Sequence, residues 1–170
     1  MPMSIITLVG LTLTATLLLR AGEGAVVTSG NISNRNVIHN VNDLAFATAH
    51  KWLMDNGATL NADNAAAGYW SSTSTLGSSV VWPANAPLVT DTTSGASSNY
   101  LIYRMCTATG AYNAPGNSCA MKDSGGVGAG NSLGYQGTAF TGGVTLMYKI
   151  IVRSIGAKGA TSVSETVVSM

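Results

Sequence analysis

The sequence predicts an α+β protein, in which one long N-terminal helix is packed on a small antiparallel β-sheet domain. Residues 4–19 form an apolar run without a charged side chain, and helical periodicity continues to about residue 56. Further on, residues 99–107, 144–155 and 161–168 are rich in the aromatic and β-branched residues typical of strands. We therefore expect residues 1–56 to form the helix, and residues 57–170 to form a globular domain of strands and irregular structure.

The composition predicts a chain that packs against copies of itself or against other proteins. The 170 residues suffice for one domain with a sizeable core. Only 9% are charged, against roughly 25% in ordinary soluble domains, and the net charge is +1. The sequence contains no basic patch, so nucleic acid and anionic membrane surfaces are not predicted as partners. A neutral surface of this kind also lacks the charge repulsion that keeps soluble proteins apart.

The apolar run is a weak membrane span. It contains 16 residues and is diluted by Gly10 and by several threonines, whereas a span needs about 20 predominantly apolar residues. A signal peptide would have a basic segment before the run and a small-residue cleavage site after it, and neither is present. We expect residues 1–21 to reside in a bilayer for a time and later to pack against protein.

Three glycines follow the run. Gly22, Gly24 and Gly30 each cost a helix about 0.5–1 kcal/mol relative to alanine. The sequence therefore predicts a stretched or unwound segment here, with Ser29 or Asn31 capping a second helical start.

The second half of the predicted helix, residues 31–56, is amphipathic and has apolar side chains on two sides. Four of these side chains share one helical face: Val37, Val41, Leu44 and Trp52. Phe46 and Leu53 lie nearly opposite that face. Burial on both sides is predicted, one against the globular domain and one against neighbouring subunits. Asn56 and Gly57 should end the helix.

Between residues 57 and 99 the sequence predicts little regular structure, with at most a short strand at residues 80–82. Residues 124–143 are dense in glycine and receive no assignment. Two strands close the chain, at 144–155 and 161–168, joined by a hairpin connection at 156–159. Alternation places Lys149 and Arg153 on one face, and Tyr148, Ile150 and Val152 on the other.

The two cysteines favour a disulfide. Cys106 and Cys119 are 13 positions apart, across a turn-rich loop. The alternative is a pair of unrelated buried thiols. A disulfide closing such a loop adds roughly 3 kcal/mol of stability and implies export to an oxidising compartment.

No catalytic, cofactor-binding or metal-binding residues are predicted, and no small-molecule substrate. His39, Asp43 and His50 fall within about 40° of one another on an ideal helix, but the two histidines are roughly 16 Å apart along it, too far to share a metal ion. The sequence also lacks a nucleophile elbow, a Walker motif and a haem-attachment motif. An enzyme is not predicted.

Several segments together carry a resemblance to a known family. The N-terminal part of the pattern consists of Gly30-Asn31, Arg35, Ala45, Ala47, Ala49 and Trp52-Leu53, after an apolar run. This pattern resembles the PilX-type pilins of bacterial type IV pili, although Ser29 stands where that family has alanine. Residues 100–106 with Cys119 look like the family's disulfide loop, and residues 147–168 look like its closing β-hairpin. Residues 58–98 match no part of the family.

The resemblance implies a type IV pilin-like ladle that forms an extracellular filament, or pilus, at the bacterial cell surface and serves cell adhesion. Such subunits wait in the inner membrane after a prepilin peptidase removes a leader, and the new first residue is then N-methylated. We expect Met1 to be that residue. The partners implied are copies of the chain in a helical homo-oligomer, or other pilins.

The assembly surface implied by the resemblance lies on the first half of the helix. We assign it to Ile5, Gly10, Leu11, Ala15, Leu18 and Gly22, where small residues allow close helix packing. Two departures from the family occur here: Ile5 replaces its usual glutamate, and Gly22 and Gly24 stand where a proline is common. The missing glutamate leaves open a minor or tip pilin, or a type II secretion pseudopilin that primes assembly. A membrane-anchored enzyme is the third alternative.

Overall fold

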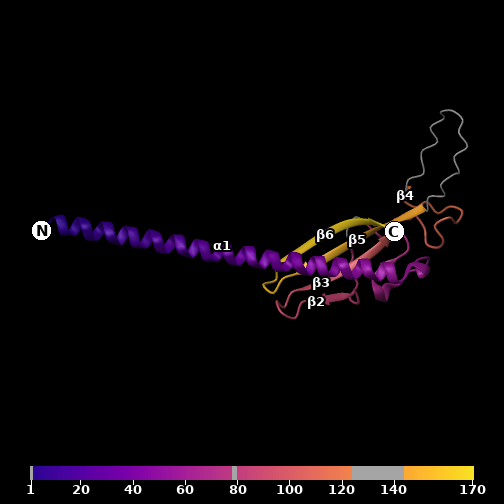
Figure 1. Ribbon diagram of the computed structural model, residues 1–170, viewed down its shortest axis with the longest axis horizontal. Helices are drawn as coiled ribbons and strands as arrows, with labels where there is room; N and C mark the ends of the chain where they lie inside the picture. The colour runs from indigo at the N-terminus through magenta and orange to yellow at the C-terminus, as the bar shows by residue number, and fades with distance from the viewer. Residues whose placement is uncertain (1, 78–79, 124–143) are drawn as a thin grey trace, which may run out of the picture.

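The molecule is an α+β protein in which one long helix projects from a small sheet domain (Figure 1). The computed structural model describes residues 2–77, 80–123 and 144–170. Helix α1 spans Pro2–Asp55, which corresponds to about 81 Å at 1.5 Å per residue. Its C-terminal half lies across the sheet, and its N-terminal half extends away from the domain (Figure 1).

Helix α1 is unbroken at the three glycines, so the predicted unwound segment and the second helical start at Ser29 or Asn31 are wrong. Gly22, Gly24 and Gly30 all lie within the continuous helix, and the hydroxyl of Thr28 donates to the carbonyl of Gly24 at 2.8 Å. Each glycine costs at most about 1 kcal/mol. A break would instead leave several backbone donors and acceptors without helical partners and would require a second nucleation.

Six strands form one sheet behind the helix: β1 (Tyr69–Trp70), β2 (Leu88–Thr90), β3 (Ser97–Arg104), β4 (Met121–Asp123), β5 (Val144–Ile155) and β6 (Thr161–Ser169). Strand β5 lies between β3 and β6 and is antiparallel to both. Strand β4 pairs with the first residues of β5, and two short 3₁₀ helices, Gly57–Thr59 and Ala65–Ala67, connect α1 to β1.

The sheet is mixed, which corrects the expectation of a purely antiparallel one. Strand β1 pairs parallel with β3, with Tyr69 opposite Ile102. A parallel pair requires a crossover connection, and the chain between β1 and β3 supplies one. On its return it adds β2, which is antiparallel to β3.

The closing hairpin agrees with the sequence prediction. Strand β5 has the predicted bounds, and β6 ends one residue later than predicted. In the connection, the amide of Gly156 donates to the carbonyl of Ala160 at 2.8 Å, and Gly159 adopts φ 77°, a conformation that favours glycine. Strand β3 begins and ends somewhat earlier than the predicted 99–107.

The predicted short strand at residues 80–82 is wrong, because these residues belong to a cover over the outer face of the sheet. Leu101, Tyr103 and Ile151 are buried on that face together with Ala86. Leu76, Val80 and Trp82 of the cover are partly buried against this cluster, as is Trp70 of β1. The sheet is therefore enclosed between this cover and α1.

The face of α1 that contacts the sheet differs from the predicted one. Its buried residues are Ile38, Val41, Ala45, Ala49 and Leu53. Val41 belongs to the predicted stripe, but Leu44 is 48% exposed, and Leu53 was placed on the opposite side. Alanines at the centre let the helix backbone approach the sheet closely, so the side chains Tyr148, Ile150 and Val152 fill the contact from β5. These three share one face of β5, as the alternation predicted.

A polar group fixes the position of the helix on the sheet. The side-chain oxygen of Asn42 accepts hydrogen bonds from the hydroxyls of Ser164, at 2.7 Å, and Ser154, at 3.3 Å. Ser154 also shares a 2.6 Å hydrogen bond with Ser98 of β3. These bonds connect α1 to three strands at one register, because a shifted helix would leave the buried hydroxyls unpaired.

Candidate functional site

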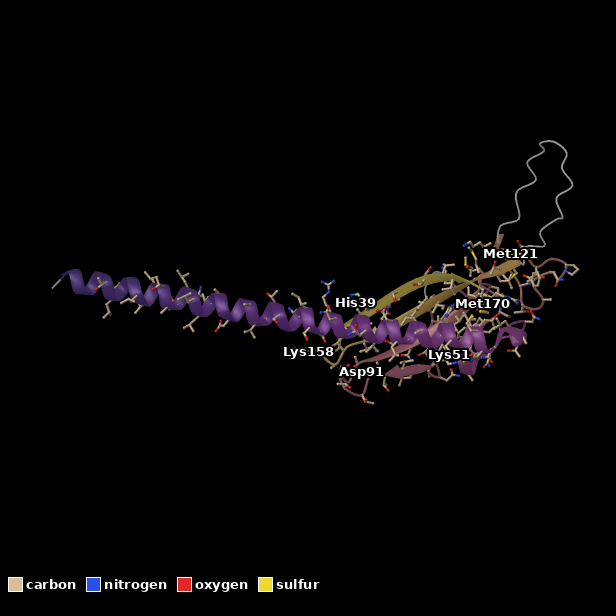
Figure 2. The ribbon with its side chains drawn as sticks, in the orientation of Figure 1. His39, Lys51, Asp91, Met121, Lys158 and Met170 are labelled. Carbon is tan, nitrogen blue, oxygen red and sulfur yellow. A yellow bond between two sulfur atoms is a disulfide. The ribbon has the colours of Figure 1, made fainter. Side chains whose placement is uncertain are left out.

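The N-terminal half of α1 is an apolar surface without a partner inside the subunit. Residues 7–29 are exposed at every position, and Figure 2 shows their side chains projecting on all sides of the helix, away from any other element. The large apolar side chains of this segment are between 50% and 73% exposed: Leu8, Val9, Leu11, Leu13, Leu17, Leu18, Leu19, Val26 and Val27. An apolar surface this extensive indicates a site of interaction with protein or lipid.

Five of the six residues assigned to assembly from the sequence lie on this surface: Gly10, Leu11, Ala15, Leu18 and Gly22. Leu11, Ala15, Leu18 and Gly22 fall within about 60° of one another on an ideal helix, and Gly10 lies about 100° from Leu11. A side-chain carbon added at Gly10 or Gly22 would contact nothing within 4 Å, so both positions are open to an approaching chain. Ile5 lies in α1, and Met1 lies outside the described residues.

The threonines of the segment are compatible with burial, a feature that the sequence analysis missed. Thr12, Thr14 and Thr16 each donate a hydrogen bond of 2.9 Å to the carbonyl three residues earlier. Because these hydroxyls are satisfied within the helix, covering them with another chain leaves no unpaired donor. From the sequence, the threonines were expected to weaken the run as a membrane span.

Two charged side chains interrupt the apolar surface. Arg20 and Glu23 are both exposed. Glu23 lines an open groove whose other lining residues are Leu18, Leu19, Gly22, Val26 and Val27. The ion pairs found among the described residues are Lys51–Asp55 and Lys149–Glu165, so Arg20 and Glu23 are not paired with each other or with another residue there.

His39, Asp43 and His50 lie farther along α1, beyond the apolar surface. His39 and Asp43 are exposed, and His50 is half-buried. Arg35 and His39 line a cleft of about 280 Å³ with Thr161 and Ser162 of β6, where α1 meets the domain. Within the described ranges, no group of three or more histidine, cysteine or acidic side chains is placed to hold a metal ion.

The disulfide predicted from the sequence is present. Cys106 and Cys119 are bonded, and the same two residues form an isolated antiparallel bridge. The bond lies at the end of the domain beyond β3, where it closes the loop between β3 and β4. It is therefore remote in sequence from the apolar surface, and it stabilises the domain.

Nothing in the described part of the chain is both long enough and apolar enough, as a helix, to cross a membrane. No family model, curated protein or solved structure matches this chain.

Proposed function

We propose that this chain is a structural subunit, a pilin, of a bacterial type IV pilus-like extracellular filament, and that it polymerises through the N-terminal half of α1. The observation that carries the proposal is the division of one continuous helix into two parts. Residues 38–53 are buried against the sheet at regular intervals, whereas residues 7–29 are exposed at every position although most are apolar.

Filament formation accounts for the exposed half energetically. Full burial of one leucine or valine side chain contributes roughly 1.5–3 kcal/mol, and this segment offers many of them on all sides. A single partner on one side would leave the remaining faces in water. A helical bundle of identical chains covers every face, and the open backbone at Gly10 and Gly22 lets neighbouring helices approach closely.

In the proposed assembly, the sheet domain coats the outside of the filament. The domain is closed by its disulfide and presents few charges, consistent with an exported protein that contacts copies of itself. The proposal includes a stage in the inner membrane before assembly, and N-methylation of Met1 after processing. Mass spectrometry of the N-terminal peptide from surface material tests both the first residue and its methylation.

The decisive experiment is electron cryomicroscopy of fibres sheared from cells that make and export the chain. The expected result is a helical reconstruction with residues 7–29 in the core and the β-domain outside. Fibres in which this segment faces solvent, or no fibres from exporting cells, would contradict the proposal.

A minor or tip pilin, or a secretion pseudopilin, is the second candidate, and Ile5 is the observation that favours it. The glutamate common at this position in type IV pilins is absent. Deletion of the chain distinguishes the two roles. A bulk subunit is expected to dominate the mass of sheared fibres, whereas a priming subunit would be scarce in fibres whose number falls when it is removed.

A further inference from the structure

The exposed apolar half of α1 carries two opposite charges. From residue 7 to residue 34, Arg20 and Glu23 are the only ionisable side chains in the sequence. They are three positions apart and therefore about 60° apart around an ideal helix, on the same side. Glu23 also lines the apolar groove formed with Leu18, Gly22 and Val26.

A charge in this position becomes costly when the groove is covered. Helices packed around all sides of this segment, as in the proposed filament, would remove both Glu23 and Arg20 from water. Burial of an unpaired carboxylate or guanidinium is strongly unfavourable, whereas burial of a hydrogen-bonded pair of opposite charges is tolerated. Tight packing of this surface therefore requires a cation beside Glu23 and an anion beside Arg20.

The isolated subunit does not satisfy this requirement. No ion pair joins Arg20 to Glu23 among the described residues, whereas Lys51 and Asp55 on the same helix do pair, at 2.7 Å. Both groups are thus available to another chain.

We propose that Arg20 of one copy of this chain pairs with Glu23 of a neighbouring copy, and that this pair allows the apolar half of α1 to be buried. The inference rests on the proposed filament. The occupant of the groove is a second copy, because an identical chain brings the complementary charge with the same apolar surroundings. For parallel copies, Arg20 of one helix lies at the same height as Glu23 of the other when the helices are offset by about 4.5 Å along their axes. Because both side chains are long, the pair can also form at somewhat smaller or larger offsets.

The test uses charge reversal in the full-length chain. Arg20→Glu and Glu23→Arg each leave two like charges three positions apart on the apolar half of α1, and each is expected to reduce the yield of sheared fibres by about 100-fold or more, because unpaired buried charge is so costly. Lys51→Glu is the matched control, since it reverses a charge in an exposed pair on the same helix, and it should change the yield by less than about threefold.

Co-production of the two reversal variants in one cell distinguishes pairing between copies from pairing within one helix. One variant carries two acidic groups and the other two basic groups, so only contacts between copies can neutralise them. We expect the mixture to restore fibres that contain both variants. Equal amounts of each chain in cells, with Cys106–Cys119 oxidised, verify that the variants fold.

Three results would overturn the inference: fibres at wild-type yield from either reversal alone, failure of the mixture to restore them, or recovery only when both reversals are in one chain. All three results are compatible with the proposed filament. An absence of fibres from the wild-type chain would instead remove the proposed function, and the inference with it.

Discussion

Arg104 is the most deeply buried charged residue in the described domain, at 1% exposure, and it joins three segments of the chain. Its guanidinium donates to the carbonyl of Ser71 at 3.0 Å, to the side-chain oxygen of Asn61 at 3.1 Å and to the carbonyl of Gly110. The planar fork of arginine serves acceptors in several directions at once. This one side chain therefore holds together the loop after α1, the cover and the disulfide loop.

Replacement of Arg104 by alanine should therefore destabilise the domain severely. Each buried acceptor left without a donor costs about 1–3 kcal/mol, so we expect Arg104→Ala to lower the free energy of unfolding by about 3 kcal/mol or more. Urea unfolding of the detergent-solubilised full chain, followed by tryptophan fluorescence, measures the change. Exposed Arg35→Ala should remain within about 0.5 kcal/mol of wild type. A loss at Arg104 no larger than at Arg35 would contradict this account.

Four tyrosines of the core make the domain sensitive to alkali. Burial raises the pKa of Tyr69, Tyr100, Tyr103 and Tyr148 above the usual value, and for Tyr69 and Tyr148 the charge of Arg104 opposes that rise in part. In the unfolded chain these groups ionise near pH 10. Their contribution is constant below that pH, and above it the unfolded state releases protons that the folded state retains, so stability falls.

We expect the free energy of unfolding to be level up to about pH 9.5 and then to fall, by up to about 1.4 kcal/mol per pH unit for each tyrosine. The same urea experiment at pH 8 to 11.5 measures the slope. Tyr148→Phe removes one ionising group from the core and should make the alkaline slope shallower. An identical slope in that variant would show that tyrosine ionisation is not its cause.

Among the elements, the loop between Cys106 and Cys119 depends on its covalent closure. Because the cysteines are 13 positions apart, loss of the bond should cost about 3 kcal/mol on the chain-entropy account. We expect Cys106→Ser with Cys119→Ser to show this loss in urea unfolding, and reduction of the wild-type chain to match it. The hydrogen bonds between Thr107 and Ser118 would remain, so a loss below about 1 kcal/mol would mean that they alone hold the loop.

The contact of the hairpin with α1 is tight at Gly156. A side-chain carbon at this position would lie 3.0 Å from Ile38 and 3.2 Å from the side-chain oxygen of Asn34. We expect Gly156→Ala to cost about 1 kcal/mol in urea unfolding through overpacking. Ile38→Val shortens the contacted side chain, so the double variant should lose less than the sum of the single losses. Gly57→Ala, where nothing lies within 4 Å, is the matched control. Additive losses would contradict the contact.

Prediction from sequence succeeded where one local signal dominated. Strands β5 and β6 are rich in β-branched and aromatic residues and are separated by a glycine turn, so their bounds were predicted to within one residue. The contact face of α1 was predicted wrongly because Ala45 and Ala49 make the contact through close approach of the helix to the sheet. Such small side chains do not stand out in a sequence as part of an apolar face. Residues 80–82 looked like a strand because Val80 and Trp82 are apolar, but they contact the sheet through side chains.

At the candidate site, the structure shows that the first half of α1 is exposed, whereas its role in assembly stays a prediction. Leu11 and Leu18 were assigned to assembly from the family resemblance, and the structure leaves both exposed. The hydrogen bonds of the threonines depend on helical geometry, which residue types alone do not give. Whether Glu23 has an ion-pair partner depends on which residues lie near it in three dimensions, so only the structure could show that it has none among the described residues.

At the scale of the whole molecule, folding and the proposed assembly use different halves of one helix. The domain is complete without residues 7–29, because its core begins on α1 at Ile38 and includes no earlier residue. The exposed half is held straight by helical hydrogen bonds alone. A change in that half should therefore affect the filament without affecting the stability of the domain.

Leu18→Gln tests this separation. The side chain is 73% exposed in the subunit, so the variant should unfold in urea within about 0.5 kcal/mol of wild type. In the filament the glutamine amide would be buried without a partner, and the yield of sheared fibres should fall by about tenfold or more. The matched control is Leu53→Ala in the buried half, which should cost the domain about 2–5 kcal/mol. If Leu18→Gln left fibre yield unchanged, this face of α1 would not be the assembly surface; if it destabilised the domain, the two halves would not be independent.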